Sequence, residues 1–400
     1  MCYGRRLQID RRGIGFGVLL NWQDKFGQEK QNYRITTRKA RNVSIFQKAK
    51  GFLPPSSRSF HGLYETVNGF NNDMGWRIHD SLDALSRIER NLEAHDAHIK
   101  MLLWELYRKE DEQIIDAKKR FFREMPKADG GLRMLQLGHA QLLNEFDRLC
   151  KKHGLRYWIA HGTLLGAVRH GGFIPWDDDT DLGMMRGELK ELIRIVADYE
   201  RYRISIIYDR FANCRQVRFC YADPDIPCFL DLFVFDFAKK PGRAAFDEMQ
   251  ADRKSMIDCL DADEDLAFWC SDDAYVDAQR PESALIAGYF DGAVNAEYAE
   301  GGFLTYDESE AESIILGIDN LDNLNGYDFF GEVDEFFPCV TVEFEGLDCP
   351  APRNGMRFIT GQYGDIYSLP KDIVSHFDHV ERSKYEGEGA TWSIPAPDGE

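Results

Sequence analysis

Four aspartates fall within five positions at residues 177–181, which read DDDTD. Side chains alternate between the faces of a strand, so Asp179 and Asp181 are expected on one face. Two carboxylates this close repel each other unless a cation lies between them. Mg²⁺, or Mn²⁺ in its place, suits such oxygen ligands. Asp177 has the same parity and is expected to join them if the strand begins early, whereas Asp178 points the other way and is expected either in the turn or as a support for a ligand.

A Gly-Thr pair precedes these acids and supplies the second part of a phosphate site. Gly162 and Thr163 open a predicted short helix over 162–170, directly after a predicted buried strand over 155–160. A helix start offers unpaired backbone N–H groups, and glycine lets a phosphate approach them closely. We therefore expect Gly162 and Thr163 to contact a phosphorylated substrate.

A third carboxylate is expected from the apolar run FLDLFVFD, which contains Asp231 and Asp236. An aspartate among apolar residues is costly unless it is paired or binds a metal. Asp231 is favoured as a metal ligand and as the base for an incoming hydroxyl. A lone D-x-D pattern also fits a solvated acidic loop, but the ordered combination favours a metal–phosphate site. This order of elements is the layout of the nucleotidyltransferase fold.

Two arginines flank the acidic stretch and could bind phosphate oxygens. Arg169 ends the predicted short helix and Arg186 follows the predicted strand over 179–185. Guanidinium groups bind phosphate through two parallel hydrogen bonds, although a structural ion pair explains either arginine equally well. Trp176 is expected to anchor the core or loop. The remaining histidines near these motifs and near the C-terminus receive no role: His161, His170, His376 and His379.

The surrounding pattern predicts an α/β (α+β) fold with a mixed sheet flanked by helices. A helix is expected over 188–199. Three β-rich runs follow it, at 202–208, 215–221 and 229–237. The catalytic domain is expected to span 131–385, with an acidic, mostly helical insert at 241–335 that holds 25 Asp and Glu against four Lys and Arg.

The N-terminal third differs from this domain in composition. Residues 1–70 are predicted to form a basic, disordered arm, since residues 1–60 hold thirteen Lys and Arg against three Asp and Glu. Residues 71–126 are predicted to be helical. In this segment Ile78, Leu85, Leu92, Ile99 and Leu106 recur every seven residues, which indicates a coiled coil. Self-association through 76–125 and packing onto the chain's own body are equally open. Residues 386–400 are expected to form a tail.

Composition excludes several classes of function. The formal net charge of −19 argues against general nucleic-acid binding, because a phosphate backbone would be repelled. No apolar stretch approaches the roughly 18–20 residues that span a bilayer. The nine cysteines show no zinc-binding spacing. We expect a cytoplasmic protein, with the basic arm able to touch an anionic membrane surface.

Residues 149–158, followed by GTLLGAVRHGGFIPWDDDTDLGMMR, resemble the LicD family of phosphorylcholine transferases, which shares its catalytic domain with the fukutin-related proteins. The resemblance continues in FLDLFVFD, FEGLDCPAP and YGDIYSLP, and covers roughly 132–238 and 336–380. It implies that Asp179, Asp181 and Asp231 are the catalytic metal ligands. It further implies that the donor is contacted by Gly162, Thr163, Arg169 and Arg186.

The resemblance also implies a reaction. Such enzymes transfer a phospho-alcohol, such as phosphorylcholine, from a CDP-linked donor to a hydroxyl of a cell-surface glycan, lipopolysaccharide or teichoic-acid (polyol-phosphate) precursor, and release CMP. Two alternatives remain open. One is a nucleotidyltransferase that uses an NTP and releases pyrophosphate. The other is a non-catalytic module that binds a glycan or a partner through the same fold.

Overall fold

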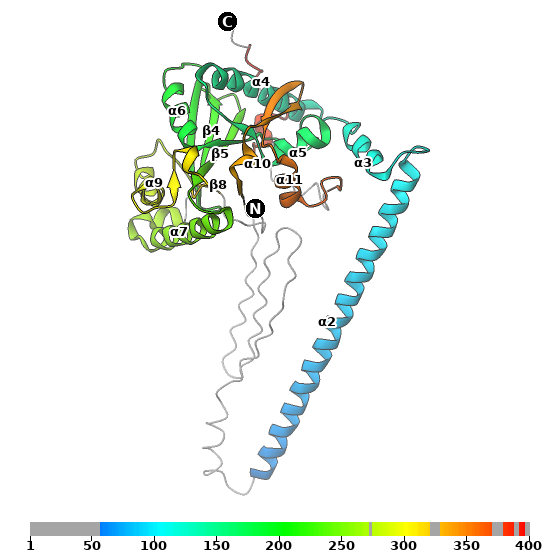
Figure 1. The fold of residues 1–400 in the computed structure, drawn as a ribbon. Coiled ribbons are helices and arrows are strands. Elements are labelled where there is room, and N and C mark those ends of the chain that lie inside the picture. The colour runs from blue at the N-terminus through cyan, green and yellow to red at the C-terminus, as the bar shows by residue number, and fades with distance from the viewer. Residues whose placement is uncertain (1–56, 272–273, 321–328, 370–378, 388–391, 397–400) are drawn as a thin grey trace. The chain divides into compact units, whose positions relative to one another are not determined.

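The computed structural model describes residues 57–271, 274–320, 329–369, 379–387 and 392–396 (Figure 1). The chain divides into two compact units, residues 1–106 and 107–400, each of which is described by itself. Most of the predicted basic arm, residues 1–56, lies outside the described residues. Among the described helices, none combines the length and apolarity needed to cross a membrane.

The predicted helix over 71–126 is two helices with different bounds. Helix α2 spans Ser57–Tyr107, so it begins within the segment expected to be disordered. Helix α3 spans Ile114–Arg123. Between them the chain turns at Asp111, whose φ of 64° no α-helix accommodates. The helix pattern predicted the presence of these elements better than their ends, because the apolar spacing continues across the turn.

The described part of the second unit is built on a nine-stranded mixed sheet with the strand order β1-β2-β5-β4-β3-β6. Strands β7 and β8 also pair with β5, and β9 pairs with β8. The pair β2–β5 is parallel and the other described pairs are antiparallel. The strands are β1 (Trp158–Ile159), β2 (Asp181–Met185), β3 (Tyr202–Asp209), β4 (Cys214–Tyr221), β5 (Phe229–Ala238), β6 (Tyr275–Asp277), β7 (Leu304–Thr305), β8 (Ser313–Leu316) and β9 (Phe330–Glu332). This arrangement confirms the predicted mixed sheet.

Helices flank this sheet (Figure 1). They are α4 (Gly130–His153), α5 (His161–His170), α6 (Arg186–Val196), α7 (Gly242–Ala262), α8 (Ala267–Ser271), α9 (Ser283–Tyr298), α10 (Val333–Phe336) and α11 (Gly355–Tyr363). Helix α4 ends where Gly154 adopts the left-handed conformation, and α5 ends the same way at Gly171. A separate hairpin is formed by β10 (Val340–Phe344) and β11 (Leu347–Ala351).

The largest hydrophobic core joins α4, α5 and α6 to the strands that carry the predicted motifs. In it Phe146 of α4 contacts Phe219 of β4, with ring centroids 5.1 Å apart. Burial of such large side chains is the main favourable term in folding. Helix α5 and strand β2 are therefore fixed by the core on both sides of the acidic stretch.

The acidic segment 241–335 is not a separate helical insert. It contributes α7, α8 and α9, but it also contributes strands β6 to β9. Strand β8 pairs with β5 over four residues, from Phe235↔Leu316 to Ala238↔Ser313. The acidic composition concealed these strands because their short apolar runs lie between long charged helices.

The C-terminal residues also differ from the predicted tail. Trp392 is 9% exposed and lies in the largest core cluster. Arg201 donates to the backbone carbonyl of Ala396 at 2.6 Å. The described part of this segment packs on the domain because a single tryptophan buries enough apolar surface to hold it.

Glu345 at the hairpin turn joins three parts of the fold. Its carboxylate accepts hydrogen bonds from Arg133 (2.7 Å), Lys127 (2.8 Å) and the backbone N–H of Phe173 (3.2 Å). Burial opposes ionisation, but these donors outweigh it and lower the pKa of Glu345 to about 2. The hairpin is thereby tied to α4 and to the loop that leads into the acidic stretch.

Replacement of Glu345 by glutamine should destabilise the protein at neutral pH by about 1.5–3 kcal/mol, the usual contribution of hydrogen bonds to a charged group. A lowered folded pKa stabilises above the unfolded value of 4.5. That contribution is lost as the pH falls through the folded value of about 2. Urea unfolding at pH 7 and pH 3 measures this difference. The exposed Glu343 supplies the control, and equal effects of E343Q and E345Q would contradict the prediction.

Candidate active site

The acidic stretch and the Asp231 strand meet because β2 and β5 are parallel neighbours. Asp181 is the first residue of β2, and its Cα is paired in register with that of Asp231. The backbone N–H of Asp231 donates to the carbonyl of Thr180 at 2.8 Å. The strand starts at Asp181, two residues later than predicted, so Asp179 lies in the preceding loop.

Carboxylate oxygens of Asp179, Asp181 and Asp231 lie within 4.8 Å of one another. Asp179 is 6% exposed and Asp181 is 8% exposed. Burial, followed by the charges of Asp179, Asp231 and Asp177, raises the pKa of Asp181 well above its usual range. Three clustered carboxylates with this mutual repulsion form a suitable set of ligands for a divalent cation. The residues present therefore fit the predicted metal.

The Gly-Thr pair holds this carboxylate set in place. The backbone N–H of Gly162 donates to Oδ2 of Asp181 at 3.0 Å. The hydroxyl of Thr163 accepts the backbone N–H of Asp181 at 2.8 Å. A Cβ atom at Gly162 would stand 3.1 Å from Oδ2 of Asp177, so a larger residue would press on that carboxylate. The structure shows the pair orienting Asp181, and its contact with phosphate stays a prediction.

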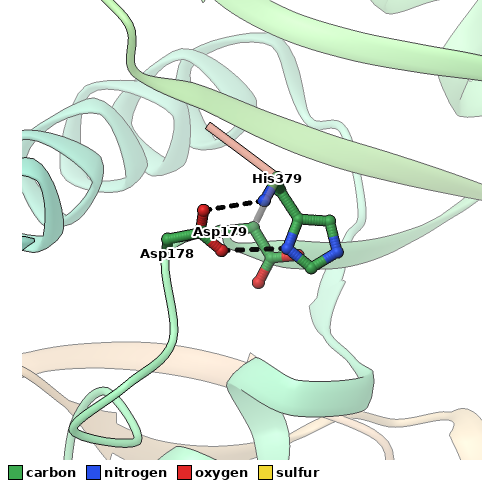
Figure 2. Close-up of side chains that lie close together, drawn as sticks. All are labelled: Asp178, Asp179 and His379. Atoms are coloured by element: carbon green, nitrogen blue, oxygen red, sulfur yellow. Dashed lines mark hydrogen bonds and ion pairs between the residues drawn. The ribbon is translucent and has the colours of Figure 1, made fainter. Parts of the chain in front are cut away.

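The other two aspartates of the stretch have different surroundings. Asp177 is buried, and its charge acts on Asp181 and on Arg169. It is not in the three-carboxylate group found among the described residues. Asp178 faces His379 and accepts its ring Nδ1–H at 2.9 Å (Figure 2). Asp178, which was expected either in the turn or as a support for a ligand, thus anchors a residue 201 positions away.

The two predicted phosphate-binding arginines lie in different places. Arg169 is buried, donates to the carbonyl of Ile366 at 3.0 Å and lies over the Phe122 ring. Burial lowers the pKa of Arg169 to about 10, against the opposing charge of Asp177. Arg169 thus stays within electrostatic reach of the acidic stretch.

Arg186 does not lie at the acidic cluster. It starts α6 at the other end of β2, five residues from Asp181 and therefore about 16 Å along the strand direction. Its guanidinium donates to Asp236 at 2.6 Å and forms an ion pair with Asp319 at 2.5 Å. The structural ion pair is the alternative that this geometry supports, whereas contact with the donor stays a prediction. Asp236, the less favoured third carboxylate, is its partner.

Three residues that the sequence reasoning missed lie at the site. Arg218 of β4 is in register with Asp231 and donates to its Oδ1 at 2.7 Å. Burial and the charges of Asp181, Asp177 and Asp179 raise the pKa of Tyr363 well above its usual range. His379 lies against Asp178 and Asp179. The pairing of β4 with β5 was not readable from local patterns, and nothing in the sequence linked the other two to residues some 180–200 positions earlier.

The pKa of His379 is unusually high for a half-buried histidine. Burial opposes the charged ring, but the hydrogen bond to Asp178 and the charge of Asp179 outweigh it. Together they raise the pKa of His379 to about 10. In contrast, burial lowers the pKa of His161 to about 4, and its ring packs against Phe233 and Phe329. His161 is therefore a neutral packing residue, as expected.

Comparison with known proteins bears directly on this domain. Residues 154–256 match the family described as LicD/FKTN/FKRP, nucleotidyltransferase domain. The match contains every residue of the three-carboxylate group. The predicted resemblance to the LicD family is confirmed, and the chain contains a LicD domain.

Individual relatives support the same family. Lipopolysaccharide cholinephosphotransferase LicD of Haemophilus influenzae is 30% identical over 135 residues, which cover 31% of this chain and 51% of that protein. Ribitol 5-phosphate transferase FKRP of Homo sapiens is 64% identical over 31 residues, or 8% of this chain and 6% of that protein. An uncharacterised protein of Rickettsia prowazekii is 42% identical over 73 residues, or 18% and 27%. The chain thus spans about half the length of the first relative and less of the others.

Proposed function

We propose that the protein is a cation-dependent phosphotransferase that moves a phospho-alcohol from a CDP-linked donor to a hydroxyl of a cell-surface glycan, lipopolysaccharide or teichoic-acid precursor, and releases CMP. The observation that carries the proposal is the group formed by the buried Asp179 and Asp181 with the partly buried Asp231, at the meeting point of β2 and β5 within the LicD domain. The two named transferases among its relatives both handle a phosphorylated alcohol, phosphocholine in one and ribitol 5-phosphate in the other.

The three carboxylates would hold Mg²⁺ or Mn²⁺. When bound, the cation would neutralise charge on the donor diphosphate and on the departing CMP. The chain's own residues prepare the site for this. The N–H of Gly162 and the hydroxyl of Thr163 fix Asp181, and Arg218 fixes Asp231.

The acceptor hydroxyl needs a base in line with the donor phosphate. Asp231 is the proposed proton acceptor, because it belongs to the acidic group and its strand neighbour Arg218 holds its carboxylate in place through Oδ1. The acceptor oxygen then bonds to the β-phosphorus while the bond from that phosphorus to the bridging oxygen breaks. Arg169, within electrostatic reach of the acids, is the proposed donor-binding arginine.

A panel of CDP-linked donors tests the function. The full-length protein is incubated with CDP-choline, CDP-ribitol, CDP-glycerol or CDP-ethanolamine, with Mg²⁺ or Mn²⁺, and CMP release is measured. CMP release from one donor, dependent on cation and on an added glycan or polyol-phosphate acceptor, is the expected result. Pyrophosphate release from an NTP, with no CMP from any CDP-alcohol, would instead establish the nucleotidyltransferase alternative.

The proposed donor and acceptor also lead us to propose a location for the protein. CDP-alcohols and glycan precursors meet on the cytoplasmic face of a membrane, so we place the protein there. The basic residues within 1–60 would supply a peripheral attachment to anionic lipid.

Helix α2 is proposed to join two copies of the chain. Its residues Ile78, Leu85, Leu92 and Ile99 repeat every seven positions and are 50–63% exposed. A strict seven-residue repeat sustained over this length matches a left-handed coiled coil of two helices. The repeat favours a second, equally long helix over the shorter helices of the domain, of which α4 has 24 residues.

The full-length protein should therefore sediment as a dimer at micromolar concentration. Changing both Leu85 and Leu92 to aspartate should give monomers, because charges at core positions of a coiled coil cannot be buried. Arg87 lies off this stripe, and R87D serves as the control that remains dimeric. A wild-type monomer, or a dimer that survives the double substitution, would remove this role for α2.

A further inference from the structure

The carboxylate of Asp178 accepts hydrogen bonds from the backbone of the segment that begins at His379. Its Oδ2 accepts the N–H groups of both His379 and Val380, each at 2.8 Å. Its Oδ1 accepts the ring Nδ1–H of His379 at 2.9 Å (Figure 2). Asp178 is 2% exposed, so these three bonds are sheltered from water. The position of the His379 ring is thereby defined by both its main chain and its side chain.

The same ring nitrogen reaches the neighbouring aspartate. Nδ1 of His379 lies 3.2 Å from Oδ2 of Asp179, one of the three proposed cation ligands. The nitrogen that is bonded to Asp178 thus also lies within ion-pair distance of Asp179. The Nδ1–H is present both in the charged ring and in the neutral ring that carries its proton on Nδ1, so this contact does not depend on the charge of His379.

The segment that carries His379 is itself fixed by the core. Val380 is 4% exposed, and Tyr385 is likewise 4% exposed in the same core cluster. The Nδ1 atom of His379, which lies near Asp179, is therefore fixed in position by the segment that carries it. A carboxylate with a fixed hydrogen-bond partner presents its oxygens to a metal in a defined direction.

We propose that His379 is a positioning residue that orients Asp179 towards the bound cation, with Asp178 as the anchor that aims the His379 ring. This inference rests on the proposed cation site. It gives a role to Asp178, one of the two aspartates of the DDDTD stretch that the metal group leaves out, and to a histidine 200 residues from Asp179.

A different use of the same atoms would be a second metal site formed by Asp178, Asp179 and His379, whose ligand atoms also lie within 4.8 Å of one another. The hydrogen bonds argue against it. A metal on Nδ1 would displace the proton that Asp178 accepts, and Asp178 already accepts two backbone N–H groups. The two possibilities differ in the number of ions bound per chain.

Direct Mn²⁺ binding to the full-length protein, followed by electron paramagnetic resonance without any donor, tests the role. His379→Ala should weaken Mn²⁺ binding about 10–100-fold, the usual effect of losing a residue that orients a ligand. His379→Asn should recover most of the affinity, because its amide nitrogen takes the place of Nδ1. His379→Gln places its amide near the Nε2 position and should recover little. Thermal melting of each variant shows that it is folded.

His153→Ala is the matched control, since His153 is exposed and contacts Tyr199 at 3.2 Å. Equal Mn²⁺ affinity in wild type, H379A and H379N would overturn the positioning role. Two Mn²⁺ ions per wild-type chain, with one lost in H379A, would also overturn it in favour of direct ligation. Wild type that binds Mn²⁺ but releases no CMP from any CDP-alcohol would contradict the proposed function and leave the positioning role intact.

Discussion

Replacement of Asp181 by asparagine is expected to abolish transfer and, at the same time, to stabilise the cation-free protein. The asparagine oxygen can still accept the N–H of Gly162, so the local backbone is kept. The negative charge that Asp179, Asp231 and burial all disfavour is removed. Activity should fall by about 10³-fold or more, because the metal supplies several kcal/mol of charge stabilisation and each 1.36 kcal/mol is tenfold in rate.

The stability gain should depend on pH. The folded pKa of Asp181 lies above the unfolded value of 3.8, so its ionised form costs the folded state free energy. That cost is absent below 3.8 and grows as the pH rises towards the folded pKa. The melting temperature of D181N should therefore exceed that of wild type by little at pH 4 and by a few degrees near neutral pH, where about 1 kcal/mol corresponds to roughly 2–4 °C.

Calorimetry with and without Mn²⁺ checks both parts of this expectation. Added cation should raise the melting temperature of wild type and have little effect on D181N. The exposed Asp223, changed to asparagine, is the control and should keep wild-type activity. A D181N protein that is less stable than wild type at every pH would show that the cluster is not under repulsion.

The second large effect is expected at Arg186, for which the structure supports a buried ion pair with Asp236 and Asp319. Arg186→Met should destabilise the protein by about 3–5 kcal/mol, the cost of breaking a buried ion pair. Its removal would leave Asp236 with only Tyr298 as a described donor at 2.7 Å, and Asp319 with Arg215. The carboxylates of both aspartates are 1% exposed, so water cannot replace the lost charge.

Urea unfolding and donor kinetics together distinguish the two roles of Arg186. The donor KM of R186M, measured well below its melting temperature, should stay within about twofold of wild type. The exposed Arg194, paired with Glu191 three residues earlier, is the control, and R194M should cost no more than about 0.5 kcal/mol. A large rise in KM at unchanged stability would restore the predicted contact with the donor.

The sequence by itself predicted most elements around the site and the three carboxylates that cluster there. Runs rich in β-forming residues identified the strands of 202–208, 215–221 and 229–237, since this preference is local to each run. The acidic stretch and the Gly-Thr pair were readable because each is a contiguous run of characteristic residue types. Asp231 was favoured as the third carboxylate from its place in the run FLDLFVFD, and the register of β2 with β5 places it beside Asp181.

Tertiary structure alone decided which side chains complete the site. His379 reaches Asp178 across 201 positions, and Arg218 meets Asp231 only because β4 pairs with β5. The ion-pair partners of Arg186, Asp236 and Asp319, were likewise not readable from its spacing to Asp181. Local patterns encode which face a residue takes, whereas contacts between distant segments depend on how strands pair and helices pack, which no single stretch of sequence contains.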